Sequence, residues 1–289
     1  MATNINFSFK RLAAVVKCDF VENWKKNFYK AVGCYCGLAA GFLTLLISRS
    51  GKYCGSDEIA YDRLCDSAHT FLMIFICIYM LVSASSILEI TNTKEKRISY
   101  MMLPATKGEK FLNRVLHSIV VSFLIFIVSL IMAELTRMAL TPLFNVPDSF
   151  SRFCLADVFT ADRYEPMLRD SIFPTSVILL LSYILWVHSI YILGGSYFRK
   201  RPFVKTVGIC FAVSFLIGFL SVSIVENTDS QYIFKWINEF ADNHTWMNDF
   251  DVMMGILSFI LLAFTAFHWT ISYRLFTKMQ ITERNLFRL

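Results

Sequence analysis

The stretch Asn92–Arg114, NTKEKRISYMMLPATKGEKFLNR, decides how this chain folds, because it is a basic segment between two long apolar runs. It carries six basic residues against two acidic ones. So dense a basic loop between two membrane spans marks the cytoplasmic side. We therefore expect a membrane protein whose second and third spans are joined by this loop.

The interior of this loop predicts a short helix, a break and a second helix. Pro104 ends the first helix, because it lacks an N–H and biases Leu103 away from the helical region. Thr106 and Glu109 have the spacing of a capping box, which starts the helix leading into the third span. Tyr100-Met101-Met102-Leu103 forms an apolar patch among the charges. The patch is either a docking surface or part of an ordinary solvated turn.

Composition and apolar runs extend the membrane prediction to the whole chain. Of the 289 residues, 56% are hydrophobic and only 17% are charged. A spanning helix needs about 20 mostly apolar residues, and lipid offers no partners for free backbone groups. The sequence therefore predicts an all-α integral membrane protein with six transmembrane helices, at Ala31–Ile47, Thr70–Ile90, Val115–Ala133, Ile172–Phe198, Val204–Val225 and Val252–Tyr273.

The distribution of charge predicts the topology. Of the 28 Lys and Arg residues, 20 fall in the N-terminal segment, the loop at 92–114, the loop after the fourth span and the C-terminal tail. The other three loops hold eight. By the positive-inside rule, both termini are expected in the cytoplasm. Residues 1–30 form an N-terminal segment, 31–273 the six-span domain and 274–289 a basic tail.

The N-terminal segment has a helical period. Apolar residues recur on one face, beside basic residues: Phe9, Leu12, Ala13, Val16, Phe20 and Trp24. This pattern is typical of an amphipathic helix lying flat in the membrane interface. A helix packed on the chain's own loops is the alternative. A second helical stripe, built from Ile233, Trp236, Ile237 and Phe240, predicts a helical outer loop over residues 226–251.

Small and aromatic residues suggest contacts within the spans. Gly33, Gly37 and Gly41 are spaced four apart, a pattern that allows another helix, from this chain or a second copy, to approach closely. Phe211, Phe215 and Phe219 share a face of the fifth span, where they could line a pathway or contact lipid. Cys54 and Cys65 fall in the first outer loop, and their spacing permits a disulfide without requiring one.

Catalytic and metal-binding patterns are missing from the sequence. It has no Gly-rich phosphate loop and no C-x-x-C pair, so we expect neither a bound cofactor nor a metal site. Gly194-Gly195-Ser196 with His268 could be assembled into an intramembrane serine protease, but Ser196 lies at the end of its span. The histidines of the spans are better explained as side chains that form hydrogen bonds between helices: His117, His188 and His268. Glu134 has Arg137 at i+3 and can pair with it.

The segment Lys96–Phe111, KRISYMMLPATKGEKF, resembles the "LP-x-[ST]-[KR]-x-E" segment between spans two and three of type-two permeases, the membrane subunits of bacterial ABC exporters. The basic amphipathic N-terminus, the six spans and the tail YRLFTKMQ at Tyr273–Gln280 fit the same family. The loop from about Thr141 to Pro174 is longer than in the simplest members.

The resemblance implies an exporter permease in the bacterial inner membrane, multi-pass and not itself an enzyme. It implies a dimer of permease copies and a separate ATPase subunit, which would bind ATP and Mg²⁺. That ATPase would dock on Lys96, Arg97, Tyr100, Met101, Leu103, Pro104, Lys107 and Glu109. No nucleic-acid partner is expected, and the substrate stays open, although an apolar interior tolerates amphipathic or lipid-like cargo. A non-transporting six-span structural or regulatory protein is the alternative.

Overall fold

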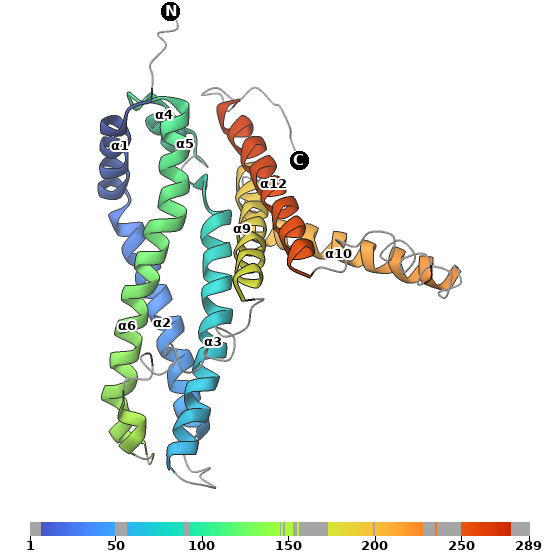
Figure 1. Cartoon of the computed structure of the whole chain (residues 1–289). Helices are drawn as coiled ribbons and strands as arrows, with labels where there is room; N and C mark the ends of the chain where they lie inside the picture. Colours follow the sequence, from blue (N-terminus) through green and yellow to red (C-terminus); the bar gives the residue numbers. More distant parts are fainter. Residues whose placement is uncertain are drawn as a thin grey trace, which may run out of the picture. The chain divides into compact units, whose positions relative to one another are not determined.

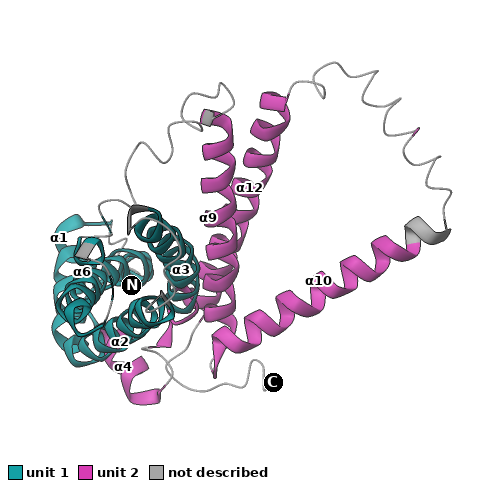
Figure 2. Ribbon diagram, turned by 90° about the horizontal axis from the view of Figure 1, so that it is seen from below, with its two compact units in different colours: residues 1–83, 103–168 teal, residues 84–102, 169–289 magenta. Residues whose placement is uncertain are grey.

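The computed structural model describes residues 7–49, 57–89, 93–144, 146, 148–152, 155, 173–198, 200–227, 235 and 250–278. These residues belong to two compact units (Figure 2). The first unit comprises residues 1–83 and 103–168, and the second comprises residues 84–102 and 169–289. Each unit is described by itself.

Six helices of the described chain are long and apolar enough to cross a membrane. This finding confirms the predicted all-α, six-span fold. The helices are α2 (Trp24–Arg49), α3 (Asp57–Ser85), the continuous run Lys107–Leu143 that includes α5 (Lys107–Leu116) and α6 (Ser122–Leu140), α9 (Phe173–Tyr197), α10 (Pro202–Asn227) and α12 (Phe250–Thr277) (Figure 1).

The boundaries of the first three spans differ from those read from hydropathy. The helix α2 begins seven residues before Ala31, and α3 begins at Asp57 rather than at Thr70 and ends at Ser85 rather than at Ile90. Backbone hydrogen bonds carry a helix past the edge of its apolar stretch, so hydropathy alone places these ends poorly. One consequence is that Cys65 lies within α3 and not in a loop.

The core of the first unit lies between α2, α3 and α6, which run side by side in Figure 1. Gly37 and Gly41 of α2 lie against the rings of Phe75 and Phe71 of α3. A Cβ atom on Gly41 would approach the Phe71 ring to 2.0 Å, so a glycine there allows the close approach. The buried residues around this contact include Leu38, Phe42, Leu46, Leu64, Leu72, Phe126 and Leu130.

The third span belongs to a helical run of 37 residues that is interrupted by a π-helical turn. At about 1.5 Å per residue this run is about 55 Å long, well beyond the about 30 Å of a bilayer's hydrocarbon core. The π turn, η2 (His117–Val121), separates the polar α5 from the apolar α6. The polar turns of α5 therefore extend beyond the membrane-spanning part.

In the second unit, α9 and α12 lie side by side, and α10 meets α9 near the short connection that joins α9 to α10 (Figure 2). Gly194 makes this meeting possible, and Gly195 allows a close approach of the backbone at Ser85. An added Cβ would come within 1.9 Å of Oγ1 of Thr206 at Gly194 and within 2.3 Å of the carbonyl oxygen of Ser85 at Gly195. These glycines therefore serve helix packing.

Candidate functional site

The predicted order of short helix, proline break and capped restart is confirmed. The helix α4 (Lys94–Met102) ends just before Pro104, and α5 starts after Thr106. Thr106 Oγ1 accepts a hydrogen bond from the backbone N–H of Glu109 at 3.2 Å, and Glu109 Oε2 accepts one from the N–H of Thr106 at 2.8 Å. This reciprocal pair is the expected capping box.

Glu109 also holds the N-terminal helix α1 (Phe9–Glu22) against α5. Its Oε1 accepts a hydrogen bond from the backbone N–H of Ser8 at 2.7 Å and one from Nη2 of Arg11 at 2.9 Å. The carboxylate is fully buried. Because Glu109 precedes the apolar run that begins at Val115, it lies outside the membrane-spanning part. The hydrogen bond from Arg11 lowers the pKa of the Glu109 carboxyl from 4.5 to about 2, so the carboxylate is ionised at neutral pH.

A second ion pair, buried on both sides, joins the same two helices further along. The two carboxylate oxygens of Asp19 lie 3.0 Å and 2.9 Å from Nη1 of Arg114. Asn113 Nδ2 donates to Asp19 at 3.2 Å, and Nδ1 of His117 lies 3.5 Å from the same carboxylate. Asp19 is 3% exposed and Arg114 is 4% exposed. We call Arg11, Asp19, Glu109, Asn113, Arg114 and His117 the α1–α5 clamp.

The order of these contacts shows that α1 and α5 run in the same direction. Residues 8 and 11 meet residue 109, and residue 19 meets residues 113–117. The predicted N-terminal amphipathic helix is thus present. The ion pairs hold it lengthwise along α5. Leu12 and Val15 pack beside Asp19 on the buried face.

The π turn next to the clamp receives a contact from α3. Ser83 Oγ donates to the carbonyl oxygen of Ser118 at 3.0 Å, and it also lies 2.5 Å from Oγ of Ser122. A π turn shifts the backbone hydrogen-bond register, and such turns occur often at functional sites. Two other helices, α1 and α3, therefore contact the chain where α5 becomes α6.

Three of the eight residues predicted to dock an ATPase are buried. Arg97 and Tyr100 are each 3% exposed, and Glu109 is fully buried. Tyr100 therefore does not offer the free apolar surface predicted from the sequence, because it shares the buried i, i+3 face of α4 with Arg97. Glu109 is used by the clamp. The other five predicted residues keep exposed or partly exposed surface: Lys96, Met101, Leu103, Pro104 and Lys107.

Two residues of this region were not among the eight predicted docking residues or the predicted contacts. Met102, at 72% exposed, is the most accessible apolar side chain of the segment. Asp19 was also missed, although its signal was present, since it is an acid at i+7 from Leu12 on an otherwise apolar face in a basic segment. An acid in that position predicts a buried cation from another element.

Three histidines were predicted to form hydrogen bonds between helices, and two of them lie against a polar side chain of another helix. His117 lies near Asp19 of α1, and Nδ1 of His268 in α12 lies 2.9 Å from Oγ of Ser189 in α9. His188 is buried, and no hydrogen-bond partner for its Nε2 is found among the described residues. Ser196 donates to the carbonyl oxygen of Ile192 within α9, and the hydroxyl that contacts His268 is that of Ser189.

The other predicted contacts are placed as follows. Gly37 and Gly41 pack within the chain, whereas the position of a Cβ on Gly33 is open. Phe211, Phe215 and Phe219 of α10 are 73%, 69% and 65% exposed. Cys65 is buried in the core, and Cys54 lies outside the described residues. Most of the predicted helical outer loop at 226–251 and of the tail after Lys278 also lies outside them.

Glu134 and Arg137 form the expected pair at the far end of the long helix. Arg137 Nη2 lies 2.7 Å from Glu134 Oε1, and Nε lies 2.8 Å from Oε2. Arg137 also donates to the carbonyl oxygens of Phe150 and Arg152, at 2.5 Å and 2.7 Å. Both side chains are almost fully buried. This pair anchors the segment that follows α6, so it serves the fold.

Among the described residues, no group of three or more His, Cys, Asp or Glu side chains could hold a metal ion. No protein-family model matches the chain, and no curated protein and no solved structure matches it. The candidate site is therefore the start of α5 and the π turn that follows it, together with α1, which the clamp holds against α5.

Proposed function

We propose that this chain is the membrane subunit of an ATP-driven exporter of the type-two permease class. A separate ATPase would dock on the segment between spans two and three. The observation that carries the proposal is the clamp, because it joins α1 to the helix that begins in this segment and continues into the third span.

The clamp gives the segment a mechanical role. A push on the start of α5 acts on a helix that continues through the π turn into α6. The same push acts on α1 through two ion pairs, of which Asp19–Arg114 is buried, and α1 leads into the first span with only Asn23 between them. Movement of the docking segment would thus reach spans one and three together, which is how a rigid element passes on a conformational change.

The docking surface in this proposal is revised from the sequence. Met102 and Leu103 supply the apolar contact, and Lys96 and Lys107 flank it with positive charge. Burial of apolar side chains would contribute affinity, and the charges would mainly guide orientation and association rate. The positive-inside charge bias supports a cytoplasmic position for this surface and both termini, and the resemblance to exporter permeases supports the inner membrane of a bacterium. A second permease copy would complete the pathway.

The proposal is tested by purifying the tagged chain in mild detergent and identifying the proteins that accompany it. We expect an ATPase with a phosphate-binding loop, whose ATP hydrolysis is retained in the reconstituted complex. Met102→Asp with Leu103→Asp should reduce the amount of ATPase recovered by about tenfold or more, which corresponds to about 1.4 kcal/mol.

The matched control is Leu143→Asp, because Leu143 is 77% exposed and lies at the opposite end of the same helical run. This variant should retain the ATPase. If the double variant recovers as much ATPase as the unchanged chain, the segment is an ordinary solvated turn. If no ATPase accompanies the unchanged chain, the non-transporting structural or regulatory protein becomes the better account.

A further inference from the structure

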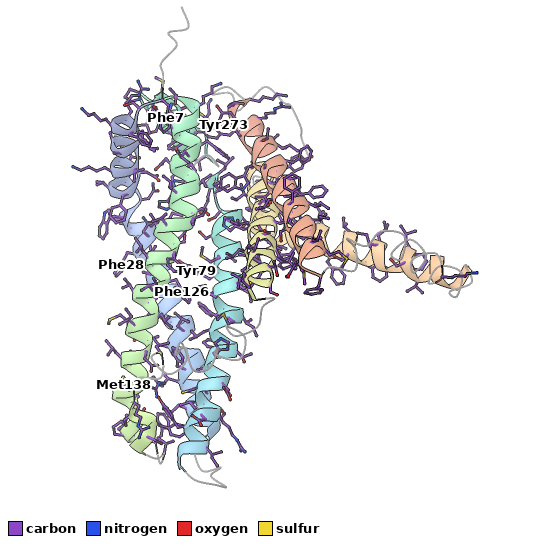
Figure 3. All side chains as sticks on the ribbon, viewed as in Figure 1. Phe7, Phe28, Tyr79, Phe126, Met138 and Tyr273 are labelled. Atoms are coloured by element: carbon purple, nitrogen blue, oxygen red, sulfur yellow. The ribbon has the colours of Figure 1, made fainter. Side chains whose placement is uncertain are left out.

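The outer side of α1 and the start of α2 form a continuous exposed surface. With Leu12, Val15 and Asp19 turned inward, the opposite side of α1 presents both aromatic and basic side chains. We call this surface the α1–α2 strip, and it consists of Phe9, Lys10, Lys17, Phe20, Trp24 and Phe28. Its four aromatic residues are between 53% and 79% exposed. Figure 3 shows side chains that project from the side of α1 facing away from α5.

We propose that the α1–α2 strip binds anionic phospholipid headgroups of the bilayer. The strip continues into the first span, because Trp24 begins α2 and Phe28 lies one turn further on. Only Asn23, with the non-helical backbone angles φ −102° and ψ 13°, separates the two helices, and its N–H bonds to the carbonyl oxygen of Asp19 while its own carbonyl oxygen accepts a bond from the N–H of Asn27. A surface continuous with a membrane span meets the same lipid that the span meets.

The spacing of the basic residues favours an anionic headgroup over a zwitterionic one. Lys10 and Lys17 are seven residues apart, so they lie on the same side of α1, about two helical turns from each other. Both lysines are exposed. Aromatic rings are stable at headgroup depth, and a lysine can extend from an apolar surface to reach a phosphate. A lysine near the surface can enrich an anionic lipid by up to about fivefold.

The clamp gives this surface a fixed direction. Without the ion pairs to α5, a 14-residue helix could rotate and expose Leu12 and Val15 instead. With Asp19 and Arg11 held, the strip always faces away from α5. The proposal goes beyond the transport function and does not depend on it, since it concerns only the lipid that contacts α1.

The experiment uses the full chain in nanodiscs with Trp24 as the reporter. Replacing the other four tryptophans (Trp186, Trp236, Trp246 and Trp269) with Phe leaves Trp24 as the sole indole. Brominated phosphatidylglycerol and brominated phosphatidylcholine are then compared as quenchers at equal mole fraction in the same lipid mixture. We expect severalfold stronger quenching by brominated phosphatidylglycerol, and we expect Lys10→Gln with Lys17→Gln to abolish the difference. Lys94→Gln with Lys96→Gln, two exposed lysines of α4, should preserve it.

Hydrogen exchange on the chain with all its tryptophans provides a second measurement. The α1 peptide should exchange more slowly in nanodiscs that contain phosphatidylglycerol than in phosphatidylcholine alone. Equal quenching by the two lipids together with equal exchange would overturn the proposal. An absence of quenching by either lipid would show that a protein segment, not the bilayer, covers the strip. A preference that survives loss of both lysines would equally refute the assigned contact.

Discussion

The two ends of the long helix Lys107–Leu143 each hold a buried ion pair, but one pair joins two helices and the other joins two residues of the same helix. At the start of the helix, Asp19 and Arg114 are 95 residues apart in sequence and connect two helices. At the other end, Glu134 and Arg137 are three residues apart on one helix, and Arg137 reaches two loop carbonyls.

The difference shows how the same chemistry serves two purposes. A local i, i+3 pair forms as soon as its helix forms, and here it organises the segment that follows. A long-range pair forms only when two elements have docked, so it records and stabilises a tertiary arrangement. Both pairs are costly to break from one side, because the remaining partner stays buried without its counter-charge. Breaking each pair should nevertheless destabilise a different part of the chain.

The largest effect is expected at the far end. Arg137→Met would leave the buried Glu134 without its cation and would remove the donor to the carbonyls of Phe150 and Arg152. We expect the free energy of unfolding to decrease by an amount near the top of the range of about 3–5 kcal/mol, measured by thermal unfolding in detergent. Adding Glu134→Gln should recover part of the loss, because the buried charge is then removed. A double variant no more stable than Arg137→Met would contradict this account.

A smaller and more local effect is expected at the clamp. Asp19→Asn would leave Arg114 buried beside a neutral partner, at a cost of about 3 kcal/mol. The reduced stability should appear as release of α1, detected by faster proteolysis between residues 9 and 22, while the three-helix core stays intact. Glu22→Gln is the matched control, because Glu22 is an exposed acid at the end of the same helix. Uniform loss of the whole first unit would show that α1 is not a separable element.

The smallest effect is expected at the helix start. Thr106→Ala removes the side-chain acceptor for the N–H of Glu109, which typically costs about 1 kcal/mol. Hydrogen exchange in the first turn of α5 should accelerate, and Thr106→Ser should restore it. Thr270→Ala is the control, because its exposed hydroxyl bonds only to the carbonyl of Ala266 within α12. Unchanged exchange in Thr106→Ala would show that Glu109 holds α5 without the cap.

The sequence predicted local features well at this site. The proline break and the capping box depend on residues only a few positions apart, so their geometry follows from the helix itself. The pair Glu134–Arg137 was predictable for the same reason. The burial of Tyr100 was not, because an apolar patch in a basic loop has the same sequence whether it is exposed or covered.

The sequence by itself determined the helical membrane fold, the number of spans and the position of the capped segment, since lipid imposes length and hydropathy on every span. Only the tertiary structure decided that α1 aligns with α5 and that Asp19 meets Arg114. It also decided that Gly37 and Gly41 serve packing within the chain. These contacts join residues far apart in sequence, and their geometry depends on how whole helices pack, which no local pattern specifies.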